Sequence, residues 1–207
     1  MKNKKVWFVT GCSKGLGYAL VNELLKQGYM VSATSRSTQA LIDAFGNESE
    51  QFLPLMVNLA DEESVKTALQ KTVLKFGRVD VVVNNAGYTH LATIEEMSDK
   101  AVRDLFDINV FGTLNVIRNV LPIMRKQNRG HIFNVSSLGA YNVGPLSGPY
   151  CATKHAIKAL SETLAMEVKQ FGIHVTDVKP GFMRTEFFGA SHKTDIAEQS
   201  PYQDLYN

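Results

Sequence analysis

Residues 5–17 read KVWFVTGCSKGLG, an apolar run that ends in three closely spaced glycines. The run Lys5–Thr10 has the β-branched and aromatic content of a buried strand, and apolar residues at helical spacing predict a helix over Gly15–Gln27. The turn between them needs glycine, because glycine adopts backbone conformations that other residues avoid and lets a phosphate approach the amides. The stretch indicates a strand, a phosphate-binding loop and a helix, although three glycines at such a junction also fit a plain structural turn.

The alternation of strand and helix continues along the chain. Predicted strands are Lys5–Thr10, Met30–Thr34, Gln51–Asn58, Val79–Asn84, His131–Ser136 and Ile173–Lys179. Predicted helices are Gly15–Gln27, Thr38–Phe45, Asp61–Phe76, Ser98–Lys126 and Pro149–Phe171. Several strands are apolar almost throughout, which is typical of a parallel sheet covered on both faces. The pattern predicts a doubly wound parallel sheet, a Rossmann-like three-layer α/β/α sandwich.

Two local features refine this prediction. Pro122 falls inside the long stretch Ser98–Lys126, so it should kink that helix or mark its last turns. After Phe188 the sequence becomes polar and irregular, and we expect no further strand there.

The composition limits the kind of protein. The 207 residues, 22.9 kDa in mass, are 44% hydrophobic, which predicts one packed domain spanning 1–207. Lys and Arg number 22 and Asp and Glu 20, a net charge of +2, which argues against nucleic acid or an anionic membrane as the main partner. Two cysteines cannot form a disulfide framework, and no apolar run reaches the ~18 residues that span a bilayer. We therefore expect a soluble cytoplasmic protein.

The residues after the second strand indicate the cofactor. An NAD site usually places a carboxylate roughly twenty residues beyond the glycines, where it binds the ribose diol. The stretch Ala33–Ser37 contains no acid, and it includes Arg36. A second cation, Lys14, lies inside the glycine loop, and two cations favour the 2′-phosphate of NADP(H) over NAD(H). Both can equally be solvated surface charges, as most exposed Lys and Arg are.

A candidate acid–base pair follows further along. Tyr150 and Lys154 lie one helical turn apart, on one face of a predicted helix. A free phenol has a pKa of ~10, and a neighbouring ammonium lowers that pKa. Ser137 follows a predicted strand, and strand ends in open α/β sheets face the ligand crevice, so its hydroxyl can meet Tyr150 there.

These residues belong to a longer series of motifs. In chain order the motifs are Thr10-Gly11-xxx-Gly15-x-Gly17, Asn84-Asn85-Ala86-Gly87, Ile108-Asn109, Val135-Ser136-Ser137, Tyr150-xxx-Lys154 and Pro180-Gly181. With these motifs in this order, from residue 5 to about residue 187, the chain resembles the short-chain dehydrogenase/reductase family. Any one motif would be weak, whereas the ordered series is specific.

The resemblance implies a catalytic set of four. Tyr150 would be the general acid/base, Lys154 would lower the Tyr150 pKa and bind the nicotinamide ribose, Ser137 would hold the substrate oxygen, and Asn109 would order a water in the proton relay. Ser136 is the neighbouring alternative for the serine role, and the spacing to Tyr150 favours Ser137.

The resemblance also implies how a nicotinamide cofactor would be held. Ser35 and Arg36 resemble the NADP-preferring pattern, Asn58 and Leu59 the pair that flanks adenine, and Thr185 the threonine that contacts the carboxamide. The full set of implied cofactor-binding residues is Gly11, Ser13, Lys14, Gly15, Leu16, Gly17, Ser35, Arg36, Asn58, Leu59, Asn85, Ala86, Gly87, Tyr150, Lys154, Pro180, Gly181 and Thr185.

The cysteines and histidines point to no further chemistry. Cys12 and Cys151 lie within the motifs and fit small packing residues. With no acidic or cysteine cluster at ligand spacing, we expect no metal site.

The chain departs from the family at its end. Relatives of this type finish with a seventh strand and the helix before it, in the sheet order 3-2-1-4-5-6-7, and neither is found after Gly181. We therefore expect residues 186–207 to be part of a substrate loop and the sixth strand, Ile173–Lys179, to be a sheet edge. We also expect the natural protein to continue for ~40–70 residues beyond Asn207.

Three functions compete. The favoured one is an NADP(H)-dependent alcohol dehydrogenase or carbonyl reductase acting on a small or medium apolar molecule. The alternatives are a catalytically silent NADP(H)-binding regulatory protein and a sugar-nucleotide epimerase or dehydratase. The first alternative predicts a degraded catalytic set and the second a different glycine loop, and the sequence has neither. By resemblance the partner is a small carbonyl or alcohol substrate, with no nucleic acid and no membrane, and a homo-oligomer, dimer or tetramer, is expected.

Overall fold

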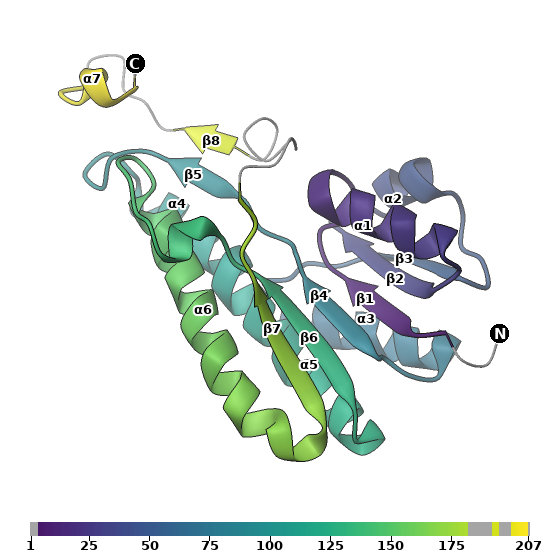
Figure 1. The fold of residues 1–207 in the computed structure, drawn as a ribbon. Coiled ribbons are helices and arrows are strands. Elements are labelled where there is room, and N and C mark those ends of the chain that lie inside the picture. Colours follow the sequence, from purple (N-terminus) through teal and green to yellow (C-terminus); the bar gives the residue numbers. More distant parts are fainter. Residues whose placement is uncertain (1–3, 182–191, 195–199, 207) are drawn as a thin grey trace.

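The protein, seen in a computed structural model that describes residues 4–181, 192–194 and 200–206, is built on one parallel sheet. Its six strands lie in the order β3-β2-β1-β4-β6-β7, and every adjacent pair is parallel (Figure 1). The strands are β1 (Val6–Val9), β2 (Met30–Ser35), β3 (Phe52–Met56), β4 (Val81–Asn84), β6 (Gly130–Val135) and β7 (Ile173–Val178). The predicted strands are confirmed to within two residues at each end, and β7 lies at an edge of this sheet as expected.

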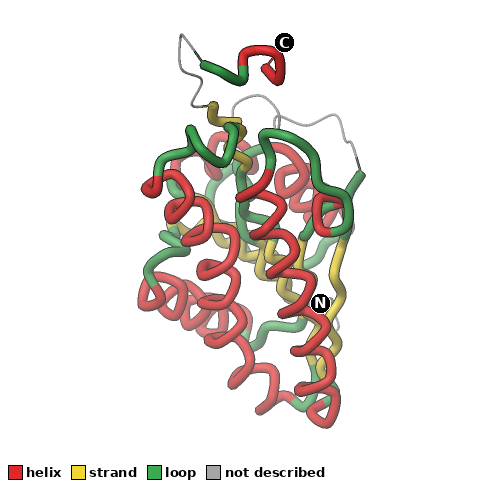
Figure 2. The backbone as a smooth tube through the Cα atoms, turned by 90° about the vertical axis from the view of Figure 1, so that its left-hand side faces the viewer, coloured by secondary structure: helices red, strands yellow, loops and turns green. Residues whose placement is uncertain are grey.

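Helices cover both faces of the sheet, so the sheet is the middle layer of a three-layer sandwich. They are α1 (Gly15–Lys26), α2 (Thr38–Phe45), α3 (Glu62–Phe76), α4 (Asp99–Phe106), α5 (Gly112–Gln127), α6 (Gly148–Val168) and the short α7 (Gln203–Tyr206). One apolar core joins the sheet to α3, α5 and α6, and a second joins it to α1 and α2. The helices run along the strands (Figure 2). The predicted doubly wound fold is confirmed.

The helix boundaries follow from local chemistry. Ser37 and Asp61 accept hydrogen bonds from free amides at the starts of α2 and α3. Gly77 ends α3 with φ +80°, and Asn128 ends α5 with φ +53°, left-handed conformations that suit these two residue types.

The long predicted helix Ser98–Lys126 is not uniform. α4 ends at Phe106, a π-helical turn (η1, Asp107–Phe111) follows, and α5 continues from Gly112. A π turn adds a residue to the helical repeat, a change that the spacing of apolar residues does not report. Pro122 lies in the last two turns of α5, as expected. The predicted helix Pro149–Phe171 is α6 followed by a 3₁₀ turn, Lys169–Phe171 (η3).

The expectation of no strand after Phe188 is wrong. β8 (His192–Thr194) pairs in parallel with β5 (Thr89–Leu91), above the carboxyl ends of the main strands (Figure 1). Strands this short carry too few residues for a recognisable pattern, so only the tertiary pairing defines them.

Two tyrosines attach the end of the chain to the loop after β5. Tyr202 donates to Glu95 at 2.6 Å, and Tyr206 donates to Glu96 at 2.6 Å. The Thr93 amide in turn donates to the Tyr206 hydroxyl at 3.2 Å. Residues 200–206 are therefore held on the same side of the sheet as the carboxyl ends of the strands.

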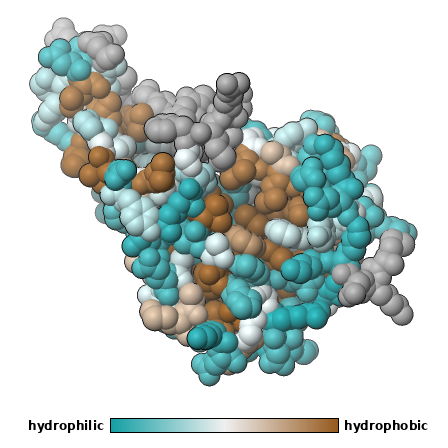
Figure 3. Space-filling model, in the orientation of Figure 1, coloured by the Kyte–Doolittle hydropathy of each residue, from teal (hydrophilic) through white to brown (hydrophobic). Residues whose placement is uncertain are grey.

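Part of the sheet face that carries α1 remains accessible. Trp7 and Phe133 stack there with ring centroids 6.4 Å apart, and both are only half-buried. In the space-filling view, apolar residues gather along the middle of this face (Figure 3). This face and the β7 edge belong to the scaffold, whereas the site lies at the carboxyl ends of the strands.

Candidate active site

A cavity of about 830 Å³ opens at the carboxyl ends of the strands. Its walls come from the loops that follow β1, β2, β3, β4, β6 and β7, together with the start of α6. Predicted site residues that line it are Gly11, Ser13, Lys14, Gly15, Leu16, Ser35, Arg36, Asn58, Leu59, Asn85, Ala86, Gly87, Ser137, Tyr150, Lys154, Pro180 and Gly181. Gly17 and Asn109 lie behind this wall, and Thr185 is outside the described residues. The fold thus brings together motifs that are far apart in the sequence.

The glycine loop has the conformation that its sequence predicts. Gly11 and Gly15 have φ values of +71° and +62°, where other residues are strained. A Cβ on Gly17 would lie 2.3 Å from the Gly11 carbonyl oxygen, so only glycine fits there. α1 begins at Gly15, and the Lys14 side chain makes no capping hydrogen bond. The first amides of α1 therefore remain available to an anion, at the positive end of the helix dipole.

Asn85 and Thr10 hold this loop in place. The Asn85 amide nitrogen donates to the carbonyls of Thr10 and Gly11 at 2.9 and 3.0 Å. The Thr10 hydroxyl accepts from the backbone amides of Asn85 and Ala86, both at 3.0 Å. The sequence analysis gave Thr10 no role of its own, yet this buried hydroxyl ties the β1 loop to the β4 loop.

The charged end of the cavity is lined by Arg36 and Lys14. Neither side chain forms an ion pair within the part of the chain that the structure describes. The Ser35 hydroxyl donates to the Ser37 carbonyl at 2.6 Å and accepts from the Ser37 amide at 2.9 Å, which fixes the turn that carries Arg36. Asp104 and Asp107, which belong to none of the sequence motifs, also line this cavity.

Ser137 and Tyr150 meet at the other end. The hydroxyl of Ser137 is hydrogen-bonded to the phenol of Tyr150 and also accepts from the Gly139 amide at 3.1 Å. Ser136 is buried, and its hydroxyl donates to the Val178 carbonyl at 3.3 Å. Both serines line the cavity, but the Ser136 hydroxyl is bonded to the backbone, whereas that of Ser137 contacts Tyr150, and this contact favours Ser137 for the serine role.

The expected lowering of the Tyr150 pKa by Lys154 is not what the structure shows. Burial raises the pKa of Tyr150, and the hydrogen bond from Ser137 opposes this only in part. Burial also lowers the pKa of Lys154 to about 8. The Lys154 ammonium lies 5.7 Å from the centroid of the Tyr150 ring and donates to the Val135 carbonyl at 2.9 Å. Desolvation is the largest cause of both shifts, because both groups are buried.

Asn109 lies in the π turn and supports the wall of the cavity. Its side-chain oxygen accepts from the Tyr88 amide at 3.1 Å, and its nitrogen donates to the Tyr88 carbonyl at 3.0 Å. A Cβ on Gly87 would be 3.1 Å from the Asn109 oxygen and 3.6 Å from the Lys154 nitrogen. Asn109 thereby fixes the backbone that separates it from Lys154.

A family model described as short chain dehydrogenase matches residues 5–195. The chain belongs to the short-chain dehydrogenase family. Oxidoreductase BOA17 of Botryotinia fuckeliana is 39% identical to this short-chain dehydrogenase over 202 residues, 96% of this chain and 73% of that protein. The 3-ketodihydrosphingosine reductase of Bacteroides thetaiotaomicron is 34% identical over 203 residues, 98% of this chain and 73% of that protein. The protein is accordingly an oxidoreductase of this family.

Solved structures of other proteins, one of them described as a short-chain dehydrogenase, have the same fold. One from Streptomyces avermitilis is 36% identical with a TM-score of 0.87, and covers 98% of this chain and 74% of its own. ElxO with NADP bound is 34% identical with a TM-score of 0.83, and covers 89% and 76%. A 3-ketoacyl-(acyl-carrier-protein) reductase from Brucella melitensis complexed with NADH is 26% identical with a TM-score of 0.85, and covers 88% and 78%.

The cysteines, the possible metal ligands and the helices of this short-chain dehydrogenase were the other features that could indicate a function. Cys12 is fully buried, its thiol donates to the Val9 carbonyl, and burial raises its pKa to about 12, so it is a packing residue. Cys151 is also buried, although its side chain lies on the cavity wall. Among the described residues, no group of three His, Cys, Asp or Glu side chains is placed to hold a metal. None of the described helices has the length and apolar character needed to cross a membrane.

Proposed function

We propose that this enzyme transfers a hydride between NADP(H) and a carbonyl or alcohol substrate, with Tyr150 as general acid and base. The observation that carries the proposal is the cavity itself, because the glycine loop lines one part and the Ser137–Tyr150–Lys154 group lines another. A nicotinamide cofactor would supply the hydride, so the protein has to orient the two reactants and move one proton.

The residues of the cavity fit such a cofactor. A side chain at Gly11 would meet Ala86 at 2.8 Å, so the loop needs glycine there, and the first amides of α1 are left open to a pyrophosphate. Asn58 and Leu59 would flank the adenine, and Pro180 and Gly181, with Thr185, would border the nicotinamide.

We infer a preference for NADP(H) from the two cations. Arg36 and Lys14 line the cavity without an ion pair to any described residue, so both cations are available to bind a 2′-phosphate. ElxO, a relative of known structure, has NADP bound. Asp104 and Asp107 act against this preference, because their carboxylates line the same cavity.

Tyr150 is suited to give a proton to a substrate carbonyl. Because burial raises its pKa, the phenol is protonated at neutral pH. Ser137 would donate its hydroxyl to the substrate oxygen as negative charge develops there. Lys154, with a pKa of about 8, is still mostly an ammonium at pH 7, and it would bind the nicotinamide ribose and stabilise the phenolate that Tyr150 becomes. Asn109 would hold the backbone beside this group and order the relay water.

The wall around Tyr150 indicates the substrate class. Leu91, Leu138 and Pro145 line this part of the cavity with Cys151, so we infer a small or medium apolar carbonyl or alcohol. We further propose a homo-oligomer, and a cytoplasmic location because both buried cysteines are free thiols. A silent regulatory role is not favoured, because Asn109, Ser137, Tyr150 and Lys154 are all present.

The test is a panel of aldehydes, ketones and alcohols, followed by the absorbance of NADPH. Replacing Tyr150→Phe keeps the ring and removes the proton, so turnover on the best substrate should fall by ~10²–10⁴ while NADPH still binds. Tyr29→Phe is the matched control, because this tyrosine is partly buried, packs on Trp7 before the start of β2 and is outside the cavity lining. A Tyr150→Phe protein with normal turnover, or an unaltered protein that neither binds nor oxidises NADPH, would contradict the proposal.

A further inference from the structure

Three polar side chains form one row across the sheet. Asn84 of β4, Asn134 of β6 and Asp177 of β7 are directly opposite one another in the strand register. Asn84 donates to the Asn134 oxygen at 2.8 Å, and the Asn134 nitrogen donates to the Ser161 hydroxyl of α6 at 2.9 Å. Opposed residues in parallel strands point to the same face of the sheet. Asp177 therefore points to the face that α6 covers.

Asp177 is the charged member of this row and is buried. Only 8% of its side chain is exposed. Lys179, directly after the end of β7, places its nitrogen 2.7 Å from one carboxylate oxygen, and the other oxygen has no hydrogen-bond partner among the described residues. A buried carboxylate is costly unless positive charge compensates it. A second cation on the α6 side would therefore stabilise it.

Lys154 supplies that second charge. It lies on α6 two helical turns before Ser161, so both side chains are on the helix face that packs on the sheet. Its ammonium donates at 2.9 Å to the carbonyl of Val135, the residue that follows the row in β6. While burial lowers the pKa of Lys154, the charge of Asp177 acts in the opposite direction.

Few other groups around Lys154 carry charge. α6 itself contributes Tyr150, whose ring centroid is 5.7 Å from the ammonium. β6 contributes a neutral carbonyl, and the π turn contributes the neutral amide of Asn109 beyond Gly87. From β7 comes Asp177, whose charge Lys179 partly neutralises. Asp177 is thus the acidic group of the described residues that faces Lys154 from outside its own helix.

We propose that Asp177 is a positioning residue, whose carboxylate keeps the buried Lys154 in its ammonium form beside Tyr150. This rests on the proposed function for the role given to Lys154 in catalysis. Asp177 lies outside the cavity lining, so it would influence the reaction through Lys154.

The experiment titrates Lys154 directly in the full chain by NMR of ¹³C-labelled lysine, with the resonance identified by its loss in Lys154→Met. Asp177→Asn keeps the shape and removes the charge, so the Lys154 titration should move to lower pH by about one unit, the lower end of the effect of a neighbouring opposite charge. Lys179→Gln should move it to higher pH, because Asp177 then acts undiminished. In Asp177→Asn the charge of Lys179 is left unpaired and could itself lower the Lys154 titration. The double variant Asp177→Asn with Lys179→Gln removes this second charge, and Lys154 should still titrate at lower pH there than in the unaltered protein.

A Lys154 titration that does not move in Asp177→Asn would overturn the inference. If Asp177→Asn does not fold, Lys179→Gln decides, and an unchanged or lowered titration in that variant overturns it as well. The pH profile of NADPH oxidation is the second measurement: activity falls as pH rises through the Lys154 pKa, and the fall should begin at lower pH in Asp177→Asn. Failure of the proposed function is seen separately, as an absence of NADPH turnover in the unaltered protein, which the NMR titration does not need.

Discussion

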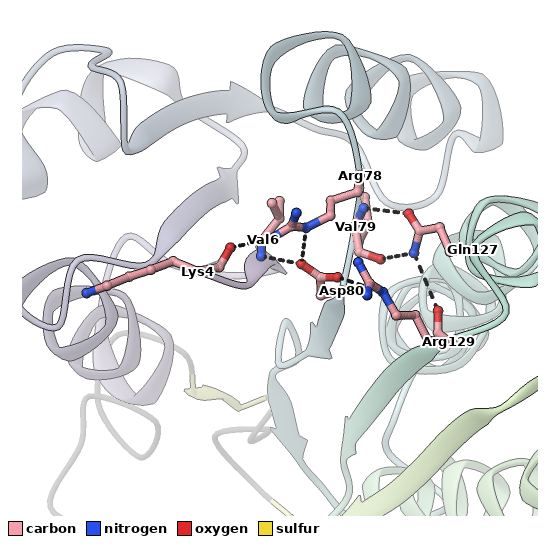
Figure 4. A network of polar contacts seen from close by, with 7 residues as sticks. All are labelled: Lys4, Val6, Arg78, Val79, Asp80, Gln127 and Arg129. Atoms are coloured by element: carbon pink, nitrogen blue, oxygen red, sulfur yellow. Dashed lines mark hydrogen bonds and ion pairs between the residues drawn. The ribbon is translucent and has the colours of Figure 1, made fainter. Parts of the chain in front are cut away.

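The two ends of the parallel sheet use polar residues in opposite ways. At the amino end, Asp80 accepts from the Val6 amide at 2.8 Å and from the Arg78 guanidinium at 2.6 Å, and lies 3.6 Å from that of Arg129 (Figure 4). Gln127 pairs with both the amide and the carbonyl of Val79. At the carboxyl end, Arg36 and Lys14 line a cavity without an ion pair to any described residue.

The amino end of the sheet therefore contributes to stability, and the carboxyl end is arranged for binding. The network around Asp80 joins the starts of β1, β4 and the loop before β6, and its groups are bonded to one another. Groups that are already bonded to one another have few free donors or acceptors for a ligand. The carboxyl end keeps charges and helix amides available, as expected where ligands bind in open α/β sheets. Changes at one end should therefore affect folding, and changes at the other should affect affinity.

The largest effect on folding is expected from Asp80→Ala. Removing this carboxylate leaves Arg78 and Arg129 without their shared partner and the Val6 amide without an acceptor. Breaking a buried pair costs ~3–5 kcal/mol, and because Arg78 is partly exposed and Arg129 largely exposed we expect ~2–4 kcal/mol here. Urea unfolding measures the loss, while turnover per folded molecule should be unchanged.

Asp99→Ala is the control for this prediction, because Asp99 forms an exposed ion pair with Arg103 at 2.7 Å. Its loss of stability should be much smaller than that of Asp80→Ala. Equal losses would show that the amino-end network contributes no more than a surface pair.

A smaller effect, confined to the carboxyl end, is expected from the double change Ser35→Asp with Arg36→Ala. An aspartate can keep the hydrogen bond to the Ser37 amide, and it presents a carboxylate where a 2′-phosphate would bind. A charge-assisted hydrogen bond contributes ~1.5–3 kcal/mol, so NADPH affinity should fall ten-fold or more while NADH affinity is kept. Fluorescence titration measures both.

Lys71→Ala, at an exposed lysine on α3, is the control, and it should leave both affinities unchanged. Equal affinity of the unaltered protein for NADPH and NADH would contradict the assignment of Arg36.

The smallest effect concerns His131, near the start of β6. Burial, together with His174 and Lys5, lowers the pKa of His131 below its ordinary value of 6.5. The folded state therefore prefers the neutral ring, and its contribution to stability is present above pH 6.5 and is lost as the pH falls. In His131→Phe the free energy of unfolding should decline less steeply between pH 7 and 5. Parallel declines for the two proteins would refute this explanation.

Much of the fold could be predicted from the sequence because the strands are apolar and the helices amphipathic. The apolar run Val81–Val83, for example, defines β4 without any knowledge of its neighbours. The π turn over Asp107–Phe111 and the pair β5–β8 could not be predicted. Both depend on contacts between distant residues, and neither changes the local pattern of apolar residues enough to be noticed.

The candidate site shows a similar division. The motifs locate the glycine loop and Tyr150 because those residues have special chemistry at fixed spacing. Asp104 and Asp107 lie on a helix face that resembles any solvated acidic face, and Asp177 is one of several polar residues in the strand Ile173–Val178. The direction of the Tyr150 pKa also depends on burial, which the sequence does not measure. The sequence does not say which groups surround a buried side chain, and these groups set its pKa and its role.

The position of β1 has a consequence for how the enzyme is made. Of the described strands, β1 leaves the ribosome before the others, yet it lies in the middle of the sheet, between β2 and β4. At ~5–20 residues per second, β4 follows β1 after roughly 4–14 s, and Gly181, the last described wall of the cavity, comes later still. During this interval the β4-facing edge of β1 is open to pairing with other chains. The growing chain therefore carries its phosphate loop long before it has a site, and the nascent polypeptide needs protection mainly at that edge.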